Sequence, residues 1–304
     1  MDNKIALVTG ATSGLGYAAA RALAEDGWRD IFVTGRSIAG IQESATQLAA
    51  ETKRQIFTPL ELELDEPSSV QSTLENLVKR GSKRMLTAAG VEASQAPLIG
   101  HHQLVVGLLH ADLLSPMVRI VISGAEPARG DVPLFSFTDV AALAAKNHKG
   151  DRTAAVEALL RNGPNVKYAP NQAYADAKLI IAWWTAALAR RLPPGMAAYA
   201  VSPGSAPSTK VVRNASPVLR WVMIPLLKFI PGMTMTPETA ARLYLQACEF
   251  KTDVSGQFFA SAPGKVTGPI EAMRHPHFHD RTNQEAAWQA VVKVSGVDLS
   301  DYQR

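Results

Sequence analysis

The sequence predicts an α/β fold in which a doubly wound parallel sheet lies between two layers of helices. Two observations lead to this prediction. Short apolar runs alternate with helical runs of alanine and leucine in the first third of the chain, and a glycine-rich stretch, TGATSGLG, joins the first strand to the first helix. Strands and helices that alternate at this length form right-handed βαβ units, which build a parallel sheet covered on both faces.

The predicted elements follow one another along the chain. The runs KIALVTG, DIFVTGR and FTPLELEL have the composition of buried strands, and Tyr17 to Asp26 has that of the first helix. Further on, RIVISG (119–124) and MAAYAVSPG (196–204) indicate two more strands, and Ala173 to Arg191 indicates a long helix.

The 304 residues are expected to form a single domain, since 47% are hydrophobic and 19% charged. Residues 125–171 are polar and marked by glycine and proline, which suggests an irregular substrate loop. Residues 205–235 are expected to form a lid over the site. Within it, residues 218–233 are apolar but are interrupted by Arg220, Pro225, Lys228 and Pro231. The run is also too short to span a bilayer.

Charge and cysteine content narrow the class of protein. The net charge of +4 is spread along the chain, which gives no nucleic-acid signature. The single cysteine, Cys248, excludes an internal disulfide and a thiolate metal site. The N-terminal residues lead directly into a strand and lack the pattern of a signal peptide. We therefore expect a cytoplasmic protein with no transmembrane segment, although residues 218–233 leave peripheral membrane contact open.

The stretch TGATSGLG has the context of a dinucleotide loop, between a strand and a helix. Gly10 permits a tight turn, Gly14 lets the backbone approach a pyrophosphate, and Gly16 allows the helix to pack closely on the strand. The amino terminus of the helix then faces the negative charge of the ligand.

A second motif, NQAYADAKLIIAWW, places Tyr174 and Lys178 four residues apart at the start of an apolar helix. This spacing puts both side chains on one helix face. The pair alone is compatible either with a catalytic dyad or with a solvated helix face, so its meaning depends on the partners that the rest of the chain supplies.

Together these motifs resemble the short-chain dehydrogenase/reductases, which have the Rossmann fold, open with Thr-Gly-x-x-x-Gly-x-Gly and carry an active-site Tyr-x-x-x-Lys. The resemblance continues in the serine of RIVISG, Ser123, and in the SPG run at 202–204. It covers nearly the whole chain and is nearest to the retinol-dehydrogenase-like and protochlorophyllide-reductase-like branch.

The resemblance implies a mechanism. Tyr174 acts as the acid or base, Lys178 stabilises its phenolate and also binds the nicotinamide ribose, and Ser123 holds the substrate oxygen. It also implies a dinucleotide site formed by Gly10, Thr12, Ser13, Gly14, Leu15, Gly16, Arg36, Ser37, Glu63, Leu64, Tyr174, Lys178, Pro203 and Gly204. Asp65 could replace Glu63 or Leu64 with a small shift.

The chain departs from the family pattern in two places. The catalytic asparagine of the preceding helix aligns with Pro97 or Leu98. The fourth strand is abbreviated, because MLTAAG (85–90) is either a degraded strand or the lead-in to the helix. The spacing to Ser123 favours the lead-in, in which case the strand is missing. A folded sheet would then use Arg84 to Ala89 as a makeshift strand.

The cofactor is predicted to be NADP in preference to NAD. NAD-preferring relatives have an acidic residue at the end of the second strand, whereas this chain has Arg36 and Ser37, and a guanidinium suits a 2′-phosphate. No metal is predicted, since His275, His277 and His279 are more typical of a solvated loop.

The sequence thus predicts an NADP-dependent oxidoreductase that acts on a carbonyl or alcohol, with a small and apolar molecule as its substrate. A protein that binds NADP as a sensor or interaction partner without turnover is the alternative, because the asparagine is missing. The long segment between Ser123 and Tyr174 is expected to cover the helices with which family members assemble, which would leave a monomer or a weak homo-oligomer.

Overall fold

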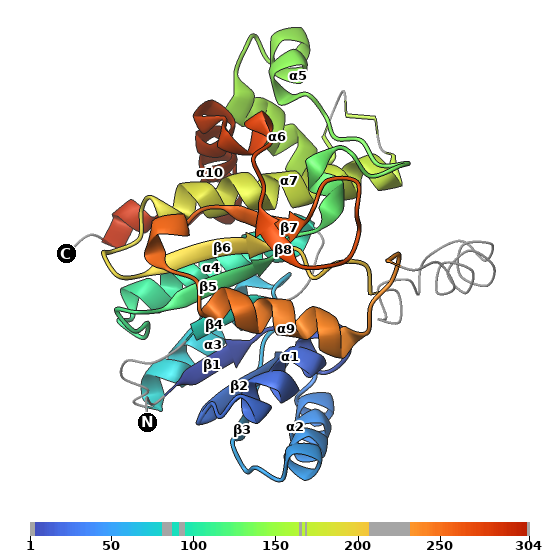
Figure 1. The fold of residues 1–304 in the computed structure, drawn as a ribbon. Helices are drawn as coiled ribbons and strands as arrows, with labels where there is room; N and C mark the ends of the chain where they lie inside the picture. Colours follow the sequence, from blue (N-terminus) through green and yellow to red (C-terminus); the bar gives the residue numbers. More distant parts are fainter. Residues whose placement is uncertain are drawn as a thin grey trace.

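The computed structural model describes residues 4–80, 87–90, 95–163, 166–167, 169–206 and 232–302, of which 87–90, 95–97 and 301–302 are described by their backbone only. In this part of the chain an eight-stranded sheet runs in the order β3-β2-β1-β4-β5-β6-β7-β8 (Figure 1). All neighbouring strands are parallel except β7 and β8. The strands are β1 (Ile5–Val8), β2 (Asp30–Gly35), β3 (Phe57–Glu61), β4 (Thr87–Gly90), β5 (Arg119–Ser123), β6 (Ala197–Val201), β7 (Phe258–Ser261) and β8 (Ile270–Ala272).

Helices cover both faces of the sheet, so the three-layer fold predicted from the sequence is confirmed. One apolar cluster joins the sheet to α1 (Gly14–Glu25), α2 (Ile38–Thr52) and α9 (Pro237–Cys248). The other cluster joins the opposite face to α3 (Pro67–Lys79), α4 (Gln95–His110), α7 (Pro170–Ala189) and α10 (Arg281–Ser295). The short 3-10 helices are η1 (Glu126–Arg129), η4 (Thr252–Val254), η5 (Pro276–His279) and η6 (Leu299–Tyr302).

The fourth strand is present but short. The four residues of β4 lie between β1 and β5, with Ala88 opposite Leu7 and Gly90 opposite Ile122. β4 overlaps the makeshift strand predicted at Arg84 to Ala89 in residues 87–89 and ends one residue later, while residues 84–86 lie outside the described part of the chain. Small residue types suit this position, since a central strand of a parallel sheet has helices on both faces.

The segment 125–171 contains helices between its loops, so it is more regular than its composition suggested. It contains η1, α5 (Val140–Asn147) and α6 (Arg152–Arg161). Each α-helix begins at a capping aspartate: the Asp139 carboxylate accepts from the amides of Ala141 and Ala142, and that of Asp151 accepts from the amide of Ala154. A capping aspartate followed by an alanine-rich run is a sequence pattern that indicates the start of a helix. The polar composition of the segment drew attention away from this pattern.

The residues of the predicted lid fall mostly outside the described part of the chain, because 207–231 are not described. The apolar run at 218–233, with its expected membrane or pocket contact, lies almost wholly among them. No described helix has the length and apolar character needed to cross a membrane.

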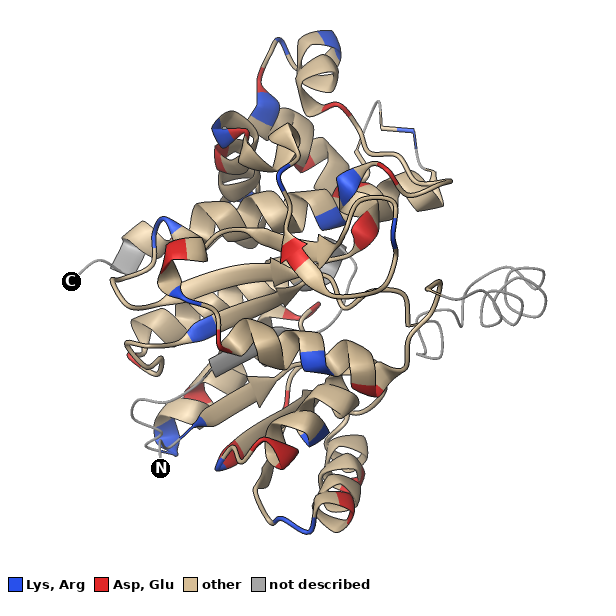
Figure 2. Ribbon diagram, in the orientation of Figure 1, with Lys and Arg blue, Asp and Glu red and all other residues tan. Residues whose placement is uncertain are grey.

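Charged residues lie mainly on the helices and loops around the sheet (Figure 2). Four charged side chains, on η1 after β5 and on α7, are buried. Among the described Asp, Glu, Lys and Arg residues, these are Glu126, Arg129, Asp176 and Lys178. Charged groups are seldom buried without a partner or a function, so this region is a candidate functional site.

Candidate functional site

The carboxyl ends of the parallel strands gather the predicted site on one edge of the sheet. The loop after β1, Ser123 at the end of β5 and the turn Ser202–Gly204 after β6 all lie there. The strand order reverses between β1 and β4, and ligands of open α/β sheets bind in the crevice that such a reversal creates.

The glycine-rich loop has the backbone that its sequence requires. Gly10 has φ of 63° and Gly14 has φ of 60°, a left-handed region that disfavours other residues. A Cβ atom at Gly16 would lie 2.4 Å from the carbonyl oxygen of Gly10, so only glycine fits there. The first turn of α1 has no acidic residue, and the Ser13 side chain does not cap it. The loop and helix therefore fit a dinucleotide phosphate.

The predicted adenosine contacts lie at the ends of β2 and β3. Arg36 and Ser37 follow β2 and are exposed, and among the described residues Arg36 forms no ion pair. Thr12 packs beside Gly35, because a Cβ atom at Gly35 would lie 2.7 Å from the methyl group of Thr12. Leu64 is placed against α4, because a Cβ atom at Gly100 would lie 2.0 Å from its carbonyl oxygen.

Tyr174 and Lys178 share one face at the start of α7. The Lys178 side chain is buried, and its Nζ donates to the carbonyl oxygen of Ser123 at 3.0 Å. The same Nζ lies 5.7 Å from the centre of the Tyr174 ring. Tyr174 itself is half-buried. The tertiary structure thus brings together the tyrosine, the lysine and the end of β5.

The hydroxyl of Ser123 has a partner that the sequence did not reveal. It lies 2.7 Å from the Tyr244 hydroxyl, and both residues are buried. Tyr244 belongs to α9, which packs on the face of the sheet opposite α7. Sequence reasoning missed Tyr244 because no motif surrounds it and only the packing of α9 on β5 brings it to the site.

The position of the family's asparagine falls at the start of α4. Leu98 is buried in the core and offers no polar group. One turn later His101 is buried, and its Nε2 lies 3.1 Å from the hydroxyl of Thr9, the first residue of the glycine-rich stretch. His101 therefore joins α4 to the end of β1.

The apolar pair Leu134 and Phe135 belongs to a segment that lies beside Tyr174. The ring of Phe135 lies 6.0 Å from that of Tyr174, at a tilted angle. The neighbouring Leu134 is 87% exposed, and its φ of 70° is unusual for a branched side chain. The Asn171 side-chain amide donates to the Leu134 carbonyl at 3.1 Å, which holds the segment against α7.

Two of the three histidines near the C-terminus, His277 and His279, lie within hydrogen-bond distance of backbone carbonyls. Nε2 of His277 lies 3.1 Å from the Ala128 carbonyl oxygen, and Nε2 of His279 lies 3.1 Å from that of Met273. Within the described residues, no group of three or more His, Cys, Asp or Glu side chains is arranged to hold a metal ion.

The chain is similar in sequence to known oxidoreductases. Residues 4–97 match the sequence model of the short chain dehydrogenase family. The chain is 26% identical to protochlorophyllide reductase from Avena sativa over 322 residues, covering 96% of this chain and 100% of that protein. It is 25% identical to retinol dehydrogenase 12 from Mus musculus over 268 residues, covering 86% of this chain and 78% of the relative.

A solved structure shares the fold. A variant of actinorhodin polyketide ketoreductase, crystallised with NADPH, superposes with a TM-score of 0.58 at 19% identity, covering 86% of this chain and 97% of the other. The resemblance stated from the motifs is therefore confirmed.

Proposed function

We propose that this chain, which belongs to the short-chain dehydrogenase/reductase family, is an NADP-dependent oxidoreductase that acts on a carbonyl or alcohol substrate. The observation that carries the proposal is the buried Lys178 amine, held between the Tyr174 ring and the Ser123 carbonyl at the carboxyl edge of the sheet. A bound NADPH would supply the hydride. The chain itself would supply the proton and orient the substrate.

Tyr174 is assigned the proton transfer. During reduction its hydroxyl gives a proton to the substrate oxygen as negative charge develops there. The Lys178 ammonium, on the same helix face, stabilises the phenolate that remains. The hydrogen bond to Ser123 holds this ammonium at the end of β5.

Ser123 is assigned the orientation of the substrate oxygen. A hydroxyl has one proton, so Ser123 can donate to substrate while it accepts from Tyr244. The 2.7 Å contact between the two hydroxyls permits that direction of donation. Such a chain of hydrogen bonds strengthens the terminal donor.

The choice of NADP over NAD rests on Arg36. Its guanidinium is exposed beside the expected adenosine site and forms no ion pair with a described residue. It is therefore available to a 2′-phosphate. The solved ketoreductase with NADPH supports a nicotinamide cofactor in this fold.

An apolar substrate is supported by the segment beside Tyr174. Leu134 exposes an aliphatic side chain, and Phe135 lies next to the tyrosine ring. Burial of such a side chain by substrate would be favourable, since apolar surface leaves water. The rival function, an NADP-binding sensor without turnover, is favoured by the absence of the family's asparagine, whose position falls at Pro97 or Leu98.

Cofactor oxidation tests the proposal. We expect the purified protein to consume NADPH with some members of a panel of aldehydes and ketones of increasing chain length. Gly16→Ala should abolish both NADPH binding and turnover, because its Cβ atom would collide with the Gly10 carbonyl. The matched control is Gly40→Ala in α2, where a new Cβ atom meets nothing within 4 Å. NADPH binding without turnover on any substrate would favour the sensor.

A further inference from the structure

Asp176 is a buried carboxyl group that the proposed chemistry does not use. It lies on α7 between Tyr174 and Lys178 and is 5% exposed. Residues two apart on a helix do not face each other, so its side chain is on a different face from that pair. Asp176 forms no ion pair with any described residue. A carboxyl group is seldom buried without a purpose, so its contacts are informative.

The partner of Asp176 is Thr138, which precedes it by 38 residues in the chain. The Thr138 amide donates to one carboxylate oxygen at 2.6 Å, and the Thr138 hydroxyl donates to the other at 2.8 Å. The side-chain amide of Gln172 donates to the same hydroxyl at 2.9 Å. Hydrogen bonds to a carboxylate are stronger than neutral ones. Three hydrogen bonds therefore fix Thr138 to the start of α7.

The segment 134–138 crosses from one face of α7 to another. Asn171 and Tyr174 are three residues apart and so share a face, where the Asn171 amide binds the Leu134 carbonyl and the Tyr174 ring lies 6.0 Å from that of Phe135. Gln172 and Asp176 are four apart and share the face that binds Thr138. The anchor at Thr138 thus continues directly into the apolar pair beside the tyrosine.

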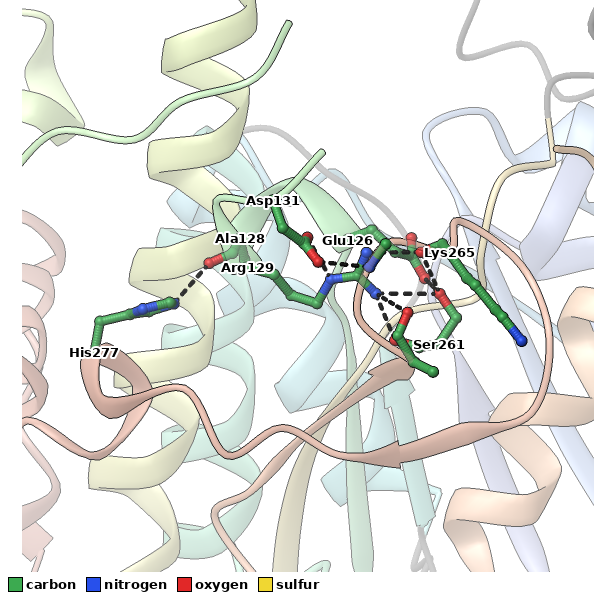
Figure 3. Close-up of polar contacts among 9 residues, drawn as sticks. Glu126, Ala128, Arg129, Asp131, Ser261, Lys265 and His277 are labelled. Atoms are coloured by element: carbon green, nitrogen blue, oxygen red, sulfur yellow. Dashed lines mark hydrogen bonds and ion pairs between the residues drawn. The ribbon is translucent and has the colours of Figure 1, made fainter. Parts of the chain in front are cut away.

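The preceding part of the chain is held separately. Nε of Arg129, on η1, donates to Asp131 at 2.8 Å, and His277 Nε2 lies 3.1 Å from the Ala128 carbonyl oxygen (Figure 3). The other guanidinium nitrogens donate to backbone carbonyls around the end of β7, which belong to Ser261, Ala262 and Lys265. Loss of the Asp176 anchor would leave these contacts in place, so its effect should be confined to residues 134–138.

We infer that Asp176 is a positioning residue for the substrate, because through Thr138 it holds Leu134 and Phe135 beside Tyr174. This inference rests on the proposed function, which assigns proton transfer to Tyr174 and an apolar carbonyl to the space beside it. A long carbonyl compound would reach the apolar pair, whereas a short one would contact only the reacting groups. Asp176 therefore contributes to the preference for chain length and not to cofactor binding.

Kinetics with the shortest and the longest aldehyde that the enzyme reduces test this inference. Asp176→Asn replaces one acceptor with a donor, which opposes one of the Thr138 bonds. The KM for the long aldehyde should rise about three- to tenfold, since its binding must then supply the order that one net hydrogen bond provided. Its kcat, the KM for the short aldehyde and the dissociation constant of NADPH should stay unchanged. Thr138→Val, which removes the hydroxyl, should act in the same way.

Two further measurements separate positioning from a general loss of structure. In a Phe135→Ala background, Asp176→Asn should have no additional effect on the KM for the long aldehyde, because the side chain that it positions is absent. Amide hydrogen exchange should become faster at residues 134–138 in Asp176→Asn and stay unchanged in β5 and the phosphate loop.

Asp139→Asn is the matched control, the same substitution at the residue after Thr138. The Asp139 carboxylate caps its own helix, α5, and asparagine caps a helix equally well, so every constant should stay unchanged. Equal rises in KM for both aldehydes, or weaker NADPH binding in Asp176→Asn and Thr138→Val, would overturn the inference. Faster exchange at 134–138 with an unchanged KM would overturn it and leave the proposed function standing. If the wild type reduces no carbonyl, the proposed function fails first and the inference falls with it.

Discussion

The hydroxyl oxygens of Ser123 and Tyr244 lie 2.7 Å apart although 121 residues separate them in the chain. This contact couples the end of β5 to α9 across the face of the sheet that α7 does not cover. Either hydroxyl can donate in this contact, and when Tyr244 is the donor, Ser123 keeps its own proton for the substrate.

Tyr244→Phe tests whether this contact serves the reaction. It should lower kcat about three- to tenfold with NADPH affinity unchanged, because Ser123 loses the donor that polarises its hydroxyl. In a Ser123→Ala background the same substitution should have no further effect on kcat. Equal losses in the two backgrounds would show that Tyr244 acts on something other than Ser123.

Tyr174→Phe tests the proton donor. Turnover should fall roughly a hundredfold or more, the range for losing a positioned acid, while NADPH binding changes at most a few-fold. Tyr199→Phe is a matched control, because the Tyr199 hydroxyl donates to the carbonyls of Phe250 and Lys251 instead. It should lower stability but leave kcat unchanged. Undiminished turnover in Tyr174→Phe would remove this residue from the chemistry.

Arg36→Asp tests the choice of cofactor. A charge-assisted contact to the 2′-phosphate should contribute about 1.5–3 kcal/mol, or roughly ten- to a hundred-and-fifty-fold in affinity. The new carboxylate repels that phosphate and accepts from the hydroxyls of an unmodified ribose, so the preference should invert toward NAD. The measurement is the dissociation constant of NADP and of NAD at one fixed ionic strength.

The control for that experiment is Arg29→Asp, the same change of charge at the opposite end of β2, where Arg29 is paired with Asp30. It should leave the ratio of the two constants unaltered. If the wild type binds both cofactors equally, or if Arg36→Asp weakens both in parallel, Arg36 does not contact the 2′-position and the NADP assignment is withdrawn.

Leu134→Asn tests whether the Leu134 side chain contacts an apolar substrate. Asparagine tolerates a positive φ better than leucine, so the free energy of unfolding should rise by about 1 kcal/mol in urea denaturation. The KM for long-chain carbonyls should rise at the same time, and that for short ones should not. Met117→Asn, at another exposed apolar residue, should give neither effect. A destabilised Leu134→Asn protein would contradict the strain at this position.

The packing of α7 predicts a monomer or a weak homo-oligomer. Every residue from Ala175 to Leu188 is buried, and both α6 and α10 pack against the helix. A helix that is buried on all sides has no face left for a partner. Light scattering at micromolar concentration should therefore give the mass of a single chain. A stable tetramer would count against this prediction.

Features that depend on local geometry could be predicted from the residues alone. The alternation of strands and helices predicts the doubly wound sheet, because each βαβ unit has one allowed hand. The glycines of TGATSGLG predict the phosphate loop, since Gly16 sits where any Cβ atom would collide. The spacing of Tyr174 and Lys178 fixes their shared helix face before any packing is known.

Contacts between elements far apart in the chain emerge from the packing of the whole fold. Tyr244 reaches Ser123 because α9 packs on β5, and Glu126 meets Ser261 because β5 and β7 end at one edge of the sheet. No local sequence pattern predicts these long-range contacts. The short strand β4 was ambiguous for the same reason: TAAG has little preference of its own, and pairing with β1 and β5 on either side makes it a strand.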